Sequence, residues 1–183
     1  MYGMVNRALK GLISERFGEA TWQEIRAKAG VEVDEFTSMS TYDDAITYDL
    51  AGAASEVLDT PIEDLLRVFG HYWIEFAGKS SYAILLEQAG KTVGEVLGAL
   101  DEMHTRLALS FTELRPPSFR VLSDDGETIM LHYESFRPAL VPFVCGLIEG
   151  VAKRLNVQVT VTLVEAKSED NPADLLRIQV LST

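Results

Sequence analysis

The stretch TVGEVLGALDEMHTRLALSF, residues 92–111, decides the fold, because its apolar residues recur at spacings of three and four. This spacing predicts an amphipathic helix, and Thr92 followed by Glu95 is a capping-box signal for its start. His104 lies on the apolar face and is expected to be buried, where its ring nitrogens need a partner. Two interpretations stay open: a core histidine bonded to a backbone carbonyl, or a ligand. The same face carries Val93, Leu97, Leu100, Leu107 and Phe111.

Length and composition suit one domain or two closely packed lobes, because the chain has 183 residues, 47% of them hydrophobic. A net charge of −12 argues against a nucleic-acid binder and against docking on an anionic membrane. Cys145 is the single cysteine, so neither an intrachain disulfide nor a cysteine metal cage is expected. We expect it to act as a small buried hydrophobe. No apolar run is long enough for a membrane span or signal peptide, which favours the cytoplasm.

Apolar spacing and start signals predict further helices in the first half of the chain. Thr21 with Glu24, and Thr60 with Glu63 after Pro61, are expected to cap two of them. A glycine inside the fourth, Gly70, would allow a bend or the close approach of a flat group. The expected helices cover residues 5–17, 21–30, 42–58, 60–76 and 81–89, with a loop at residues 31–40.

The second half is predicted to be strands around one helix. Two β-branched and apolar runs flank Asp124-Asp125-Gly126, a hairpin signal. Gly146 and Gly150 lie one turn apart and would let another body pack closely against the helix. The strands are expected at residues 119–122, 128–131, 157–164 and 175–181, and the helix at 138–155. The predicted fold is α+β: an N-terminal helical subdomain and a C-terminal four-stranded antiparallel sheet with a crossing helix.

A run of hydrogen-bond donors follows the predicted hairpin, in LHYESFR at residues 131–137. If the strand continues, Tyr133, Ser135 and Arg137 share a face with Ile129 and Leu131, because alternate side chains point the same way. A phenol, a hydroxyl and a guanidinium together suit a ligand with an apolar body and an anionic edge. The alternative is a polar strand end at the rim of the sheet.

Together, the histidine and the donors match what haem requires: an axial ligand, a flat apolar slot and partners for two propionates. A second interpretation is a small enzyme in which His104 is a general base and Arg137 clamps a carboxylate. Against it, no second titratable group lies at matching spacing on the face of His104. A third is a haem-free interaction module, which would be colourless. His71 and His132 are expected to be exposed or structural.

The whole chain resembles the haem-nitric oxide/oxygen binding (H-NOX) family, the bacterial relatives of the haem domain of soluble guanylate cyclase. Tyr133-x-Ser135-x-Arg137 matches the propionate clamp of that family, and Asp101-Glu102-Met103-His104 matches the segment bearing its proximal haem ligand. Two further matches are Pro116-Pro117, beside the macrocycle, and residues 146–150, on the helix behind the pocket. The resemblance implies one domain over residues 1–183, with a distal helical lobe at 1–60 and a proximal lobe with the sheet at 61–183, and haem between the helical and sheet parts.

The resemblance also implies roles for individual residues toward haem b. His104 would be the proximal iron ligand, and Tyr133, Ser135 and Arg137 would bind the propionates. Pro117 would press on the porphyrin and hold it out of plane. The distal side, where the gas binds, would be lined by Val5, Trp73, Phe143 and Leu147, and Leu100 and Met103 would be further haem contacts.

Phe143 departs from the oxygen-binding members of the family, which have a tyrosine at this position. Phenylalanine cannot donate a hydrogen bond to bound dioxygen, so nitric oxide and carbon monoxide would be favoured. Trp73 is the open point, because its indole N–H would donate if it faced the iron. The resemblance implies a sensor in which nitric oxide breaks the iron–His104 bond and the two halves shift. A separate sensor histidine kinase or cyclic-di-GMP enzyme would read that shift.

Overall fold

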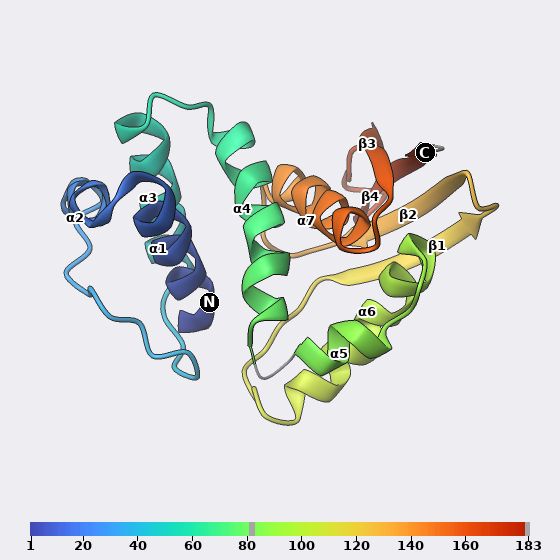
Figure 1. The fold of residues 1–183 in the computed structure, drawn as a ribbon, viewed down its shortest axis with the longest axis horizontal. Coiled ribbons are helices and arrows are strands. Elements are labelled where there is room, and N and C mark those ends of the chain that lie inside the picture. Colours follow the sequence, from blue (N-terminus) through green and yellow to red (C-terminus); the bar gives the residue numbers. More distant parts are fainter. Residues whose placement is uncertain (81–82, 182–183) are drawn as a thin grey trace.

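Helices come first along the chain and strands later, with α7 between them, as the computed structural model of residues 1–80 and 83–181 shows (Figure 1). The α+β prediction is therefore confirmed. The expected start of the fifth helix at Ser81 lies outside the described residues. The elements are α1 (Gly3–Phe17), α2 (Glu19–Lys28), α3 (Asp44–Val57), α4 (Ile62–Gly78), α5 (Ala83–Gln88), α6 (Val93–Ala108), β1 (Ser118–Asp124), β2 (Thr128–Glu134), α7 (Val141–Arg154), β3 (Gln158–Glu165) and β4 (Ala173–Leu181).

The helices α1 to α4 share one apolar core. Trp22 of α2 is fully buried there, and its indole N–H donates to Oδ1 of Asp34 at 3.0 Å. Gln23 and Lys10 donate to the same carboxylate oxygen at 3.2 Å each. One acidic side chain therefore holds the loop at residues 31–40, which has no helix or strand, against α1 and α2.

Two predicted helix caps are wrong, and a third is right. Thr92 and Glu95 form the full capping box at the start of α6. Thr21 instead lies inside α2, which begins two residues earlier after Gly18, and its hydroxyl donates to the Phe17 carbonyl at 2.9 Å. At α4 the N-cap position is occupied by Pro61, and Thr60 donates to the Leu58 carbonyl.

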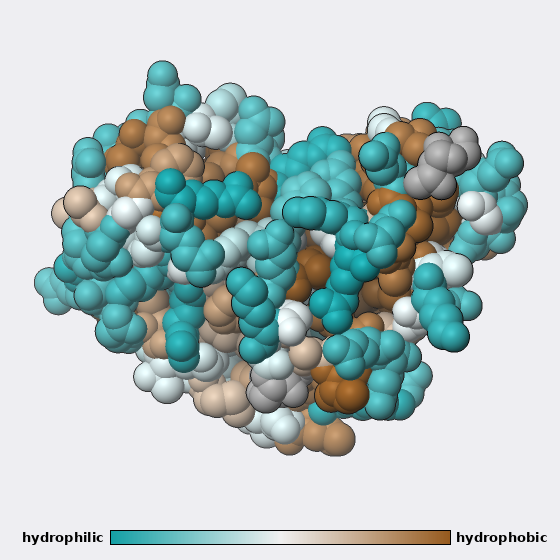
Figure 2. All heavy atoms as spheres, viewed as in Figure 1, coloured by the Kyte–Doolittle hydropathy of each residue, from teal (hydrophilic) through white to brown (hydrophobic). Residues whose placement is uncertain are grey.

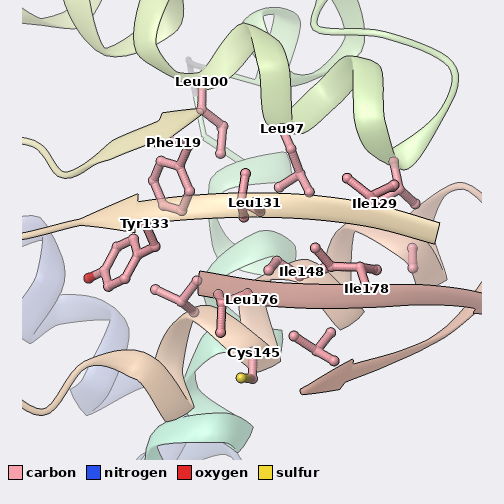
Figure 3. Packing of buried hydrophobic residues seen from close by; sticks show 14 residues of the cluster. Leu97, Leu100, Phe119, Ile129, Leu131, Tyr133, Cys145, Ile148, Leu176 and Ile178 are labelled. Carbon is pink, nitrogen blue, oxygen red and sulfur yellow. The ribbon is translucent and has the colours of Figure 1, made fainter. Parts of the chain in front are cut away.

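The sheet is antiparallel throughout, in the order β1-β2-β4-β3. Its covered face carries Ile129 and Leu131 of β2 opposite Ile178 and Leu176 of β4, all nearly fully buried. Figure 3 shows residues of α6 and α7 packed against these strands in one apolar cluster. A sheet covered on one face explains why buried and half-buried residues alternate along β2.

Strand β2 ends at Glu134, so the face that the sequence predicted Tyr133, Ser135 and Arg137 to share ends at Tyr133. Ser135 and Arg137 follow in the irregular segment that leads into α7. That helix begins at Val141 rather than at Pro138, while Pro142 lies in its first turn, as predicted.

Helices α4 and α7 cross with their backbones in contact. A Cβ atom on Gly70 would lie 2.1 Å from the Phe143 carbonyl oxygen, and one on Gly146 would lie 1.9 Å from that of Arg67. The close approach expected at Gly70 is therefore made by a helix rather than by a flat group. Figure 1 shows α4 between the N-terminal helices and the sheet. This crossing fixes the position of α4 relative to α7.

The proposed boundary at residue 60 stays a prediction. Helix α4 contributes Leu65 and Phe69 to the core of the N-terminal helices, and Ile74 to a second cluster with α6 and α7. Among the described helices, none combines the length and apolar character needed to cross a membrane.

Candidate functional site

A cavity of about 300 Å³ lies where α1, α3 and α4 meet α6, α7 and the sheet. Its volume is at the lower end of the range of roughly 300–1,000 Å³ for small-molecule sites. Figure 2 shows a largely hydrophilic outer surface with apolar atoms visible in a recess near the middle of this face. The cavity is lined by every residue for which the family resemblance implied a contact with haem or gas: Val5, Trp73, Leu100, Met103, His104, Pro117, Tyr133, Ser135, Arg137, Phe143 and Leu147.

The imidazole of His104 reaches the cavity from α6. Its Nδ1 is buried and has no hydrogen-bond partner of normal geometry among the described residues. Burial lowers the pKa of His104, while the nearby Asp101 carboxylate and the Pro117 carbonyl oppose this shift. The ring is therefore neutral near pH 7, which is the form that binds metal ions.

A metal at this place would need most of its ligands from a cofactor. No group of three or more His, Cys, Asp or Glu side chains in residues 1–80 and 83–181 is arranged to hold a metal ion. One neutral imidazole beside an apolar cavity therefore fits an iron that already has four equatorial ligands, as in haem. The fit rests on the side chain of His104 and on the lining of the cavity.

Asp101 ties the His104 helix to the start of β1. Its carboxylate accepts hydrogen bonds from Oγ of Ser118 at 2.7 Å and from the backbone N–H of Phe119 at 2.8 Å. These bonds fix the backbone directly after Pro117, which lines the cavity. The Phe119 ring then lies 6.1 Å from that of His104. The sequence did not predict this role of Asp101, although its position one turn before His104 was a usable signal.

The opposite rim carries the three donors. Tyr133 is 2% exposed, and burial raises the pKa of its phenol, which therefore stays protonated and can donate. Its ring packs 5.3 Å from that of Phe119. Oγ of Ser135 accepts the backbone N–H of Arg137 at 3.2 Å, which turns the chain so that both side chains line the cavity.

Arg137 already binds an acidic residue, Asp44, and this contact was not predicted from the sequence. Its Nε and NH2 donate to the two oxygens of Asp44 on α3 at 2.7 and 3.2 Å, and its NH1 donates to the Arg115 carbonyl at 3.2 Å. A guanidinium has five N–H donors, so two remain for an anionic group. One turn along α3, Tyr48 donates to the Pro138 carbonyl at 3.0 Å. Helix α3 thus holds residues 135–138 in place through Asp44 and Tyr48.

The Asp44→Asn variant should unfold with a free energy lower by about 1–2 kcal/mol at neutral pH, because a partly buried, charge-assisted pair is lost. Arg137 holds the pKa of Asp44 below its ordinary value. The pair therefore stabilises the fold above about pH 4, and this contribution is lost as pH falls through the lowered pKa. Urea unfolding at several pH values measures it. Asp49→Asn, on the exposed face of the same helix, is the control and should change little.

The far wall of the cavity is aromatic and apolar. Phe143 of α7 lies with its ring 5.2 Å from that of Phe69 and 6.4 Å from that of Trp73, both on α4. Val5 and Leu147 complete this wall. Among the described residues, no hydrogen bond engages the indole N–H of Trp73. Apart from that group, these five side chains offer no hydrogen-bond donor.

The other histidines and the cysteine lie outside the cavity lining. His71 Nε2 is 2.9 Å from Oε2 of Glu149, and His132 Nδ1 is 3.2 Å from NH2 of Arg120. Cys145 is buried in the core between α7 and the sheet, where burial raises the pKa of its thiol. A structural role for these three residues stays a prediction.

The fold and the cavity define a class: an α+β domain whose apolar cavity is lined by His104 on one element and by Tyr133, Ser135 and Arg137 on another. The chain belongs to the haem-NO-binding (HNOB) family, whose model matches residues 2–163. Members of this family bind haem and serve as gas-sensor domains without catalytic activity of their own. This assignment sets aside the enzyme with His104 as a general base, and it confirms the resemblance and the cofactor that the sequence predicted.

The comparisons with single proteins agree with the family. The soluble guanylate cyclase gcy-31 of Caenorhabditis elegans is 28% identical over 172 residues, which are 93% of this chain and 24% of the cyclase. The chain thus spans about a quarter of the length of that relative. S. oneidensis H-NOX in the Fe(II)NO ligation state superposes with a TM-score of 0.86 at 18% identity over the whole of both chains. An oxygen-binding H-NOX domain in its oxygen complex superposes with a TM-score of 0.82 at 21% identity, over 100% of this chain and 96% of that one. These structures show a shared fold.

Proposed function

We propose that this domain senses nitric oxide, and also binds carbon monoxide, at ferrous haem b held by His104. The observation that carries the proposal is the far wall of the cavity, where Phe143 lies beside Phe69 and Trp73 and offers no hydroxyl to a bound gas. Dioxygen on iron is polar and depends on a donated hydrogen bond, whereas nitric oxide does not. A relative with this fold binds oxygen, so the fold alone does not decide the ligand.

The proposed cofactor contacts follow the lining of the cavity. His104 would supply the axial nitrogen, while Tyr133, Ser135 and the two remaining N–H groups of Arg137 would hold the propionates. Pro117, Leu100 and Met103 line the same cavity and would contact the macrocycle. Bound haem would supply the iron that takes the gas, and the residues would supply its position, its dry surroundings and its selectivity.

The test exposes the ferrous protein to air and, separately, to nitric oxide, and records absorption spectra. Wild type should form a stable nitric oxide complex and no stable oxygen complex. Phe143→Tyr should bind oxygen about 10- to 150-fold more tightly, which corresponds to one hydrogen bond of roughly 1.5–3 kcal/mol to a charged group. The measurement is an oxygen titration of both proteins.

Trp73→Phe separates the two possible donors in the same titration. It removes the indole N–H and keeps an aromatic ring, and on the proposed function it leaves the oxygen affinity of wild type unchanged. A stable oxygen complex of wild type that disappears in Trp73→Phe would show that the indole is the donor. The proposal that this domain selects against oxygen would then be wrong.

The proposed signal starts at α6. His104 would link this helix to the iron of bound haem, and Asp101 couples the same helix to β1 through Phe119. Loss of the iron–His104 bond would free the C-terminal half of α6. The hydrogen bond between Asp101 and Phe119 would then transmit the movement of α6 to β1. We propose that a separate cytoplasmic effector, a sensor histidine kinase or a cyclic-di-GMP enzyme, reads the resulting shift.

A further inference from the structure

The two edge strands of the sheet, β1 and β3, differ in how far their outer backbone groups are protected. On β1, the Asp101 carboxylate accepts the N–H of Phe119, and a bulge lies between Val121 and Ser123. Strand β3 pairs with β4 on one side, and in the part of the chain that the structure describes no strand pairs with its other side. Six of its eight residues are exposed. A free edge of this kind presents backbone N–H and C=O groups that can pair with another strand.

The β3 edge also lacks the charges that usually prevent such pairing. No charged residue occurs between Asn156 and Val164, although the chain as a whole has a net charge of −12. Proteins commonly place lysine or proline on an exposed edge to keep other strands away. Here the protection is a single irregularity between Leu163 and Glu165, at the far end of the strand.

We propose that β3 pairs antiparallel with β3 of a second copy, with Val161 opposite Val161. In this register Thr160 faces Thr162 of the other copy, and Val159 faces Leu163. Val161 pairs with the buried Ile178 of β4, and Leu163 with the buried Leu176, so these odd-numbered residues point to the covered face of the sheet. Threonines therefore pair on the outer face and apolar residues on the inner face. The strand is complementary to itself.

The position of β3 leaves room for this contact. Figure 1 shows β3 and β4 on the side of the molecule away from α1, α2 and α3. The irregularity after Leu163 ends the continuous pairing, so the contact spans Gln158 to Val164. Two copies each carrying −12 repel at long range, and salt screens this repulsion within about 8 Å at physiological ionic strength. Dimerisation should therefore strengthen as salt is added.

Sedimentation equilibrium of the haem-loaded full chain, from about 10 to 500 µM and in low and high NaCl, tests the proposal. The apparent mass of wild type should approach twice the 20.2 kDa of one chain as concentration rises. In high salt it should do so at a lower protein concentration. The double variant Thr160→Lys with Thr162→Lys places like charges directly opposite and should raise the dissociation constant by about 100-fold or more. Leu122→Lys with Ser123→Lys adds the same charge to exposed positions on β1 and should dimerise like wild type.

A charge-reversed partner makes the test specific. Thr160→Glu with Thr162→Glu should be monomeric alone and should form a heterodimer when mixed with the lysine variant, because opposite charges then face each other. The absorption spectrum of bound haem and the circular dichroism check that each variant is folded. Wild type that stays monomeric at 500 µM in high salt overturns the proposal. So does a dimer that the lysine variant leaves intact.

Discussion

His104→Gly should yield a folded protein that no longer retains haem. Among the described residues, no other imidazole lines the cavity, and no group of three or more His, Cys, Asp or Glu side chains is arranged to hold a metal. Loss of an axial ligand should weaken haem binding by more than about 100-fold, beyond the 10- to 100-fold typical of outer-shell partners. Haem content after purification measures this effect. Free imidazole added during loading should restore the colour, because it can occupy the vacated position.

Two control variants make this result specific. His104→Ala removes the imidazole without the helix cost of glycine, about 1 kcal/mol, and should also lose haem. His132→Gln alters a histidine outside the cavity lining and should keep normal haem content. Normal haem retention in His104→Ala without imidazole would remove His104 as the ligand.

Gly146→Ala should destabilise the fold strongly although it adds a single methyl group. Its new Cβ would lie 1.9 Å from the Arg67 carbonyl oxygen and 2.7 Å from the carbonyl carbon, distances that backbone atoms cannot tolerate. Helices α4 and α7 would have to separate, and the free energy of unfolding should fall by about 3 kcal/mol or more. Thermal unfolding should show a Tm lower by roughly 6–12 °C or more.

Gly98→Ala is the matched control, because it introduces the same methyl group into a helix without a clash. Nothing among the described residues lies within 4 Å of a Cβ at this exposed position on α6. Alanine is the better helix former by about 0.5–1 kcal/mol, so this variant should be slightly more stable than wild type. Equal stability of the two variants would mean that the helix crossing is not as tight as the structure has it.

Local sequence signals predicted the fold where the deciding interactions are local. The apolar spacing around His104 and the Thr92–Glu95 box specify α6, because the atoms involved are within a few residues of one another. The same pattern failed at Thr21, where Gly18, with φ of 92°, ends α1 and starts α2 two residues earlier. A capping motif within a longer helix is indistinguishable in sequence from one at its start.

For the site, the sequence supplied the residues but not their partners. Tyr133, Ser135 and Arg137 were recognisable as a group of donors because they are close in the chain. The partner of Arg137, Asp44, precedes it by 93 residues, and no local pattern links the two. The contact between Gly70 and α7 was missed for the same reason, since glycine shows that something approaches but does not say what. The roles toward haem therefore stay predictions until they are measured.

The most direct test of the central claim is the resonance Raman spectrum of the ferrous protein carrying His71→Gln and His132→Gln. Of the three histidines in the chain, only His104 then remains. The account predicts an iron–imidazole stretching band that shifts when histidine is labelled with ¹⁵N and that disappears when nitric oxide is added. Absence of this band from the single-histidine protein would contradict ligation by His104. A band that persists in the presence of nitric oxide would contradict release of α6.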